Sequence, residues 1–163
     1  MTMEQKSWWV KVGHRTPEPE NSTYAGVVSQ ESVRIDLTYA ALNGLNVYAR
    51  DIKNSYLQIP SSEKYFIICS PEFGLENIGK RAMIIRALYG VNRAGADYWG
   101  HVWYEVYEMG FEYCKADTDI WFCSATKYNG TDKYQYVLLY KDEIMEIMQN
   151  PEDFIRHELA KNF

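Results

Sequence analysis

Two acidic residues at the end of an aromatic, alternating segment carry the clearest chemical potential in this sequence. They are Asp142 and Glu143, which follow Tyr140 and Lys141, and a further acid, Asp51, closes an apolar segment far upstream. Carboxylates at strand ends can together bind a pair of Mg²⁺ ions over a phosphate, because Mg²⁺ takes oxygen ligands. An acidic pair is also common in solvated turns, since Asp favours turns for backbone reasons. Both interpretations stay open from these residues alone.

The composition predicts one globular domain with a mixed α/β core. The chain has 163 residues, of which 47% are hydrophobic and 24% charged, and its 14 Tyr and 5 Trp suit strands and a packed core. The formal net charge of −5 argues against autonomous binding of nucleic acid through a basic face. A nucleic-acid enzyme with this charge would need basic surfaces on another domain.

The cysteines and the hydropathy pattern predict an intracellular protein, either cytoplasmic or nuclear. Cys69, Cys114 and Cys123 are odd in number and lack metal-type spacing, which is typical of reduced thiols. No apolar run approaches the length of a membrane span, so we expect no membrane partner.

Capping residues and apolar spacing predict three helices. The first runs from the N-cap Ser29 to Asn43-Gly44, and the last begins at Asn150-Pro151. Between them, a helix follows Leu88-Tyr89-Gly90 and ends before Gly110. Apolar stripes predict the buried faces of the first two helices, and these residues are Val33, Leu37, Ala40 and Ala41, then Trp99, Val102, Trp103 and Val106.

Alternating and apolar runs predict the strands. These are 45–52, 65–69, 83–85, 120–123, 134–140 and 144–148, with Asn129-Gly130 as a hairpin signal. Residues 1–25 are expected to be irregular. The order of elements predicts an α+β fold, in which an antiparallel-rich sheet has helices packed on one face.

Four segments of this chain, in matching order and spacing, resemble the reverse transcriptase domain of copia-type LTR retrotransposon polyproteins, the products of transposable elements that integrate into DNA. The resemblance runs from about Gly13 to Phe163. The matching segments are 29–34 with 40–43, 51–57 (DIKNSYL), 87–90 (ALYG) with Trp99, and 116–119 (ADTD) with 140–143 (YKDE).

This resemblance implies a polymerase right-hand palm with partial fingers over residues 26–163, without the thumb and ribonuclease H domains of the family. The implied activity is that of an RNA-directed DNA polymerase, a nucleotidyltransferase that uses two Mg²⁺ ions roughly 4 Å apart. The implied partners are an RNA/DNA primer-template, a deoxynucleoside triphosphate and other domains of a polyprotein.

The resemblance also assigns roles to individual residues. It implies that Asp51, Asp142 and the carbonyl of Ile52 bind metal, with Glu143 as the third catalytic acid. Tyr56 falls at the aromatic gate beneath the nucleotide sugar, although an ordinary strand-end aromatic is the alternative. Two further residues, Lys6 and Arg93, fall at or near positions that contact the nucleotide or nucleic acid.

Several positions depart from the pattern of the family. Glu143 replaces an aspartate and adds a methylene, which shifts its carboxylate at a site where Mg²⁺ demands near-ideal geometry. Lys141 replaces a small apolar residue, and Trp8 stands where an arginine grips the triphosphate, so Lys6 or Lys11 would have to substitute. Arg93 replaces a glutamine. These departures, with the missing thumb, support the alternative of a catalytically inactive remnant that acts as a binding or structural protein.

Overall fold

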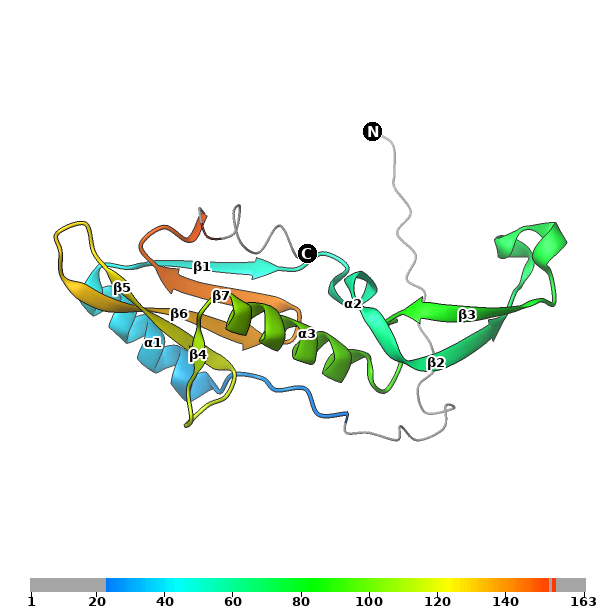
Figure 1. Ribbon diagram of the computed structural model, residues 1–163, viewed down its shortest axis with the longest axis horizontal. Helices are drawn as coiled ribbons and strands as arrows, with labels where there is room; N and C mark the ends of the chain where they lie inside the picture. Colours follow the sequence, from blue (N-terminus) through cyan, green and yellow to red (C-terminus); the bar gives the residue numbers. More distant parts are fainter. Residues whose placement is uncertain (1–22, 153, 155–163) are drawn as a thin grey trace. The chain divides into compact units, whose positions relative to one another are not determined.

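The computed structural model of the chain describes residues 23–152 and 154 (Figure 1). Contacts between Cα atoms divide these residues into two compact units. The ribbon unit comprises residues 23–24 and 56–98, and the sheet unit comprises residues 25–55, 99–152 and 154. The predicted acidic site residues therefore all belong to the sheet unit, whereas Tyr56 and Arg93 belong to the ribbon unit.

The sheet unit is built on a five-stranded antiparallel sheet with the order β1-β7-β6-β5-β4. Its strands are β1 (Asn46–Asp51), β4 (Glu112–Tyr113), β5 (Ile120–Thr126), β6 (Asp132–Tyr140) and β7 (Glu143–Met148). Four of them confirm predicted strands, and the predicted hairpin around Asn129-Gly130 joins β5 to β6. The sequence did not predict β4, because two residues are too few to show an alternating pattern.

Helix α1 (Gln30–Asn43) has the predicted ends but a different buried face. The Ser32 N–H donates to Ser29 Oγ at 3.2 Å, and Gly44, with φ of 59°, closes the last turn. The buried residues of the helix are Asp36 and Ala40. Leu37, which the apolar stripe placed in the core, is 40% exposed. That part of the prediction is wrong, because the helix turns a carboxylate toward the sheet in place of the leucine.

Helix α3 (Ala94–Glu108) contributes its 99–108 segment to the sheet unit. Val102 and Val106 are fully buried, which confirms the predicted face at those positions, while Trp99 and Trp103 are half-buried. Gly110, with φ of 84°, follows the helix as predicted.

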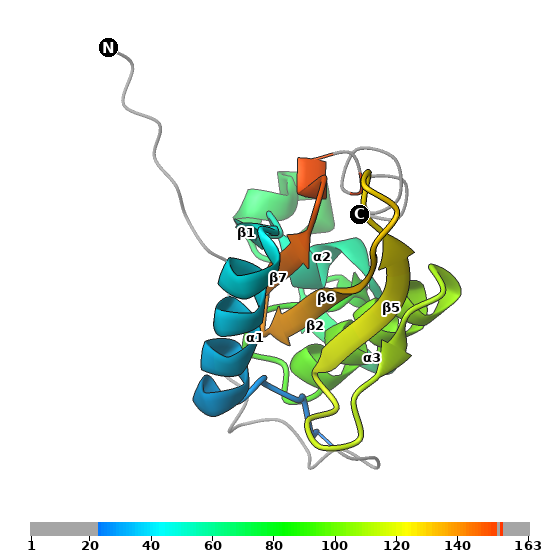
Figure 2. The ribbon, with the colours of Figure 1, turned by 90° about the vertical axis from the view of Figure 1, so that its left-hand side faces the viewer.

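The two helices lie on opposite faces of the sheet (Figure 2), so the predicted packing on one face is wrong. Ala40 of α1 belongs to a core cluster with Ile120 of β5, whereas the ring of Trp103 in α3 lies 5.1 Å from that of Trp121. Adjacent residues of a strand point to opposite faces, so Ile120 faces α1 and Trp121 faces α3. The broader prediction of a mixed α+β fold with an antiparallel sheet is confirmed.

The ribbon unit contains an antiparallel pair of strands, β2 (Pro60–Ile68) and β3 (Arg81–Arg86). Short 3₁₀ turns, η2 (Pro71–Phe73) and η3 (Leu75–Asn77), lie in the connection between them (Figure 1). The two strands confirm the predicted runs 65–69 and 83–85 and extend them. Helix α2 (Ser55–Gln58), which was not predicted, precedes β2.

The ends of the chain are described only in part. Pro151, Glu152 and Phe154 are helical, in agreement with the helix expected after Asn150, and its remainder lies outside the described residues. Nearly all of the segment 1–25 lies outside them as well. Within the described part of the chain, no helix combines the length and apolarity needed to cross a membrane.

Candidate functional site

The three acidic residues predicted for the site come together at the end of two neighbouring strands. Asp51, the last residue of β1, lies directly opposite Glu143, the first residue of β7. One step beyond this pair, the N–H of Ile52 donates to the carbonyl of Asp142 at 2.9 Å. Hydrogen-bonded pairing between β1 and β7, which lie side by side (Figure 1), therefore brings the backbones of Asp51, Asp142 and Glu143 together.

A tight turn between β6 and β7 positions Asp142. Tyr140 pairs with Glu143, which leaves Lys141 and Asp142 as a two-residue loop. Lys141 has φ of 53°, the left-handed conformation that such hairpin turns require. Its ammonium lies 5.8 Å from the centroid of the Tyr140 ring. Asp142 is half-buried, and Asp51 and Glu143 are exposed.

The side chains of Asp51 and Glu143 share one face of the sheet, because directly opposed residues in an antiparallel ladder point the same way. Glu143 lines a cavity of about 230 Å³ with Val33 of α1, so this is the face that α1 covers. Asp142 lies in the turn, outside the ladder. The carbonyl of Ile52 already accepts the N–H of Ser55 at 3.1 Å and keeps a second lone pair.

These oxygen ligands fit a Mg²⁺ ion that takes part of its coordination shell from a substrate. Among the described residues, no three or more His, Cys, Asp or Glu side chains are gathered to hold a metal ion. Mg²⁺ is nevertheless usually bound through one or two carboxylates, with water and substrate phosphates as its other ligands. The oxygens at the ends of β1 and β7 match that requirement in chemical type, and they do not form an all-protein cage.

A buried acid near the site was not singled out from the sequence. Glu146 on β7 has no solvent exposure, and neither of its carboxylate oxygens has a hydrogen-bond partner among the described residues. Burial raises the pKa of Glu146 to about 7, although Arg50, whose Nε lies 4.0 Å from Oε2, acts in the opposite direction. The signal was present in the sequence, since Glu146 interrupts an apolar run that the strand buries.

Asp117 of the segment 116–119 caps α1. Its carboxylate accepts the N–H of Ser29 at 3.0 Å and the hydroxyl of Ser32 at 2.7 Å, and it also accepts the N–H of Asp119 at 3.3 Å. Burial by itself raises the pKa of Asp117, but the hydrogen bonds outweigh it and hold the pKa below its ordinary value. The bond from Ser32 thus links Asp117 to a helix 85 residues away along the chain.

We expect Asp117→Ala to lower the free energy of unfolding by about 1–2 kcal/mol, because the first turn of α1 loses its carboxylate acceptor. Urea unfolding followed by circular dichroism measures the change. Glu108→Ala is the control, since Glu108 is an exposed acid at the end of α3. Equal stability of the Asp117 variant and the control variant would contradict the assignment.

In the ribbon unit, Tyr56 lies in α2 and belongs to an aromatic cluster. Its ring centroid lies 4.7 Å from that of Tyr89 and 5.4 Å from that of Tyr98. The alternative of an ordinary strand-end aromatic is wrong, since β1 ends at Asp51 and Tyr56 is helical. The cluster joins Tyr56 to the segment 87–90, which contains Tyr89.

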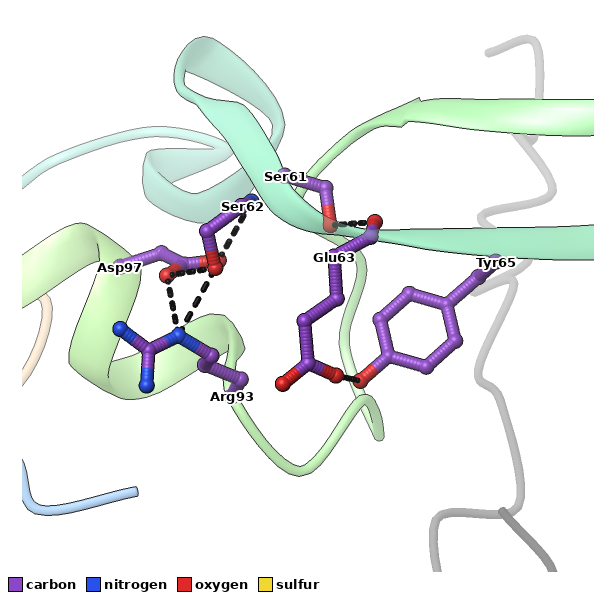
Figure 3. A network of polar contacts seen from close by, with 6 residues as sticks. All are labelled: Ser61, Ser62, Glu63, Tyr65, Arg93 and Asp97. Atoms are coloured by element: carbon purple, nitrogen blue, oxygen red, sulfur yellow. Dashed lines mark hydrogen bonds and ion pairs between the residues drawn. The ribbon is translucent and has the colours of Figure 1, made fainter. Parts of the chain in front are cut away.

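Arg93 takes part in a polar network at the start of α3 (Figure 3). Its Nε donates to Ser62 Oγ at 2.8 Å and to Asp97 Oδ1 at 3.1 Å. Asp97 also accepts the hydroxyl and the N–H of Ser62, at 2.6 and 3.0 Å. The charge of Arg93 is therefore balanced by Asp97 within this unit. Lys6, the other predicted nucleotide contact, lies outside the described residues.

Comparison with known proteins identifies the family. A family model described as reverse transcriptase (RNA-dependent DNA polymerase) matches residues 3–163, nearly the whole chain. The chain therefore belongs to the reverse transcriptase family, which confirms the sequence-based expectation at this level. Neither the curated proteins nor the solved structures gave a match.

Proposed function

We propose that the chain is the palm and part of the fingers of a copia-type reverse transcriptase, and that it acts in RNA-directed DNA polymerisation. Family membership supports this proposal. The observation that carries it is the pairing of Asp51 with Glu143 beside the hydrogen bond from Ile52 to Asp142. Asp51 and Asp142, which are 91 positions apart in the sequence, thereby share one end of the sheet.

In this proposal Asp51, Asp142 and the Ile52 carbonyl hold divalent cations, and Glu143 is the third acid. Bound Mg²⁺ would neutralise charge on the triphosphate and favour ionisation of the primer 3′-hydroxyl. The contribution of the chain is to hold its oxygens at fixed spacing. The antiparallel ladder sets the spacing of Asp51 and Glu143, and the two-residue turn limits the freedom of Asp142.

The proposed nucleotide contacts are Tyr56, Arg93 and Lys6. The rings of Tyr89 and Tyr98 support the Tyr56 ring, which suits a rigid gate beneath the sugar. Arg93 would have to exchange part of its pairing with Asp97 for a phosphate. Guanidinium groups suit that exchange, since they bind carboxylate and phosphate with the same fork of donors.

The test is Mg²⁺-dependent primer extension on an RNA template, together with Mn²⁺ binding followed by electron paramagnetic resonance. We expect Asp142→Asn to abolish extension. Replacing a residue that only supports a metal ligand typically weakens metal binding by about 10- to 100-fold, and the loss of Mn²⁺ affinity in Asp142→Asn should exceed that range. Asp132→Asn is the control, because Asp132 begins the same strand, β6, at its other end. Equal Mn²⁺ affinity in Asp142→Asn and the unmodified chain would rule out the proposed ligand.

A second candidate function is that of a non-catalytic binding or structural protein that retains this fold. Two observations favour it: the described residues hold no three-ligand metal group, and Asp97 already pairs with Arg93. Calorimetry with Mg²⁺ and a nucleotide separates the candidates, because the polymerase proposal expects binding that depends on Asp142. Extension gained by the double variant Glu143→Asp, Lys141→Val would identify a decayed polymerase.

A further inference from the structure

Asp119 is a buried carboxylate that the proposed chemistry does not use. It immediately precedes β5 and is 2% exposed. Its Oδ1 accepts the indole Nε1–H of Trp99, in α3, at 2.6 Å. Burial raises the pKa of Asp119, and the hydrogen bond from Trp99 acts against that effect. The side chain of Asp119 therefore ties α3 to the beginning of β5.

The main chain of Asp119 reaches the strand that leads into the Lys141-Asp142 turn. Its carbonyl accepts the N–H of Leu139 at 2.9 Å, and the carbonyl of Leu139 accepts the N–H of Val28 at 3.1 Å. Next to this contact, Val27 forms a bridge with Tyr140. The N–H and the carbonyl of Leu139 are therefore each hydrogen-bonded, to Asp119 and to Val28, just before the turn begins.

The carboxylate of Asp119 also limits how closely the segment 26–28 can approach the beginning of β5. A Cβ atom added to Gly26 would lie 2.2 Å from both oxygens of Asp119, far inside van der Waals contact. The backbone at Gly26 thus lies directly against the carboxylate. Val28, two residues after Gly26 in the same segment, donates the N–H group that binds the carbonyl of Leu139.

We propose that Asp119 is a positioning residue for the turn that carries Asp142. It joins α3 through Trp99, supports the segment 26–28 by direct contact, and holds Leu139 through its carbonyl. Displacement of its carboxylate would move all three, and with them the pairing of Asp142 with Ile52. The inference rests on the proposed function in one respect, namely that Asp142 is a metal ligand.

Two substitutions at Asp119 and one at Trp99 test the positioning role. Asp119→Leu keeps the branched shape and the number of side-chain heavy atoms but has no acceptor. Asp119→Asn keeps an oxygen for the indole, and Trp99→Phe removes the donor. Glu112→Leu is the control, because Glu112 is an exposed acid on β4 of the same sheet. All variants are compared under conditions where circular dichroism shows a native spectrum.

The first measurement is amide hydrogen exchange by NMR. We expect Asp119→Leu and Trp99→Phe to speed exchange of the Val28, Leu139 and Ile52 amides by about tenfold, because local opening at the turn becomes easier. The amide of Lys127 is the internal reference, since it donates to Thr131 at the far end of the β5–β6 hairpin. Asp119→Asn should stay close to the unmodified chain. Equal acceleration at Lys127, or none at Leu139, would overturn the proposal.

The second measurement is Mn²⁺ affinity, which a purely structural role would leave unchanged in folded protein. We expect Asp119→Leu to weaken the Asp142-dependent affinity about tenfold, with recovery in Asp119→Asn. Unchanged affinity in Asp119→Leu would show that Asp119 does not position the ligand. If the unmodified chain shows no Asp142-dependent binding, the proposed function fails, and hydrogen exchange alone decides whether Asp119 positions the turn.

Discussion

Replacing Glu146 with Met is expected to raise the free energy of unfolding at pH 8 by about 3 kcal/mol. The native pKa of Glu146 is about 7, against an ordinary value of 4.5, because burial penalises the charged form. Each unit of difference corresponds to about 1.4 kcal/mol. Met has a similar length and no charge, so it removes the penalty without leaving a cavity.

The pH dependence of stability gives the sign of this effect. Below about pH 4.5 the carboxyl group of Glu146 is protonated in both states and has no ionisation penalty. Between about pH 4.5 and 7 it ionises in the unfolded state and stays protonated in the native state, so native stability falls as pH rises. Above about pH 7 the loss is complete. The stability gain of Glu146→Met should therefore grow across this window and then level off.

Urea unfolding of the unmodified chain and of Glu146→Met from pH 4 to pH 9 measures the difference between their free energies of unfolding. Titratable groups that both proteins contain, such as Asp36, cancel in that difference. Glu146→Gln is the control for charge alone. It should flatten the pH dependence in the same window but gain less stability, because among the described residues its buried amide would also lack hydrogen-bond partners. Parallel stability curves for the unmodified chain and Glu146→Met would show that Glu146 does not titrate as described.

Gly26→Ala is expected to lower the free energy of unfolding by about 3 kcal/mol, at the upper end of the usual range for overpacking. The new methyl group would lie 2.2 Å from both carboxylate oxygens of Asp119. That carboxylate cannot easily move aside, because it is buried and bonded to Trp99. Thermal and urea unfolding of the variant measure the loss.

A glycine on α3 provides the matched control. A Cβ at Gly100 would meet no atom of the described residues within 4 Å, so Gly100→Ala should stabilise the chain by up to about 1 kcal/mol through helix propensity. A double-mutant cycle identifies the clashing partner. In an Asp119→Ala background most of the penalty of Gly26→Ala should disappear. Additive effects of the two substitutions would exclude this contact as the cause.

Local features of the fold could be predicted because their causes lie within a few residues. Ser29 and Gly44 delimit α1, since a side-chain cap and a left-handed glycine act on adjacent peptide groups. The Asn129-Gly130 hairpin and the strands β5, β6 and β7 follow from turn chemistry and apolar pattern in the same way. The segments around Asp51 and Asp142 were likewise identified from short motifs.

The placement of the helices shows where this reasoning fails. Val137, Leu138 and Leu139 are consecutive and all buried, so both faces of the sheet are covered. That continuous apolar run was a sign that the sheet needs a helix on each side, but the prediction treated β6 as a strand buried on one face. The buried face of α1 was misjudged for a related reason, since an apolar stripe does not reveal that Asp36 is turned inward.

The sequence alone determined the family, the ends of α1, most of the strands and the acidic residues proposed as ligands, because each of these depends on residue types at short spacing. Only the tertiary structure decided that Asp51 lies opposite Glu143, that Trp99 bonds to Asp119 and that Glu146 is buried with no hydrogen-bond partner among the described residues. These features join residues far apart in the chain or depend on which face of a strand is covered. Such contacts are selected by the packing of the whole unit, and no local pattern encodes them.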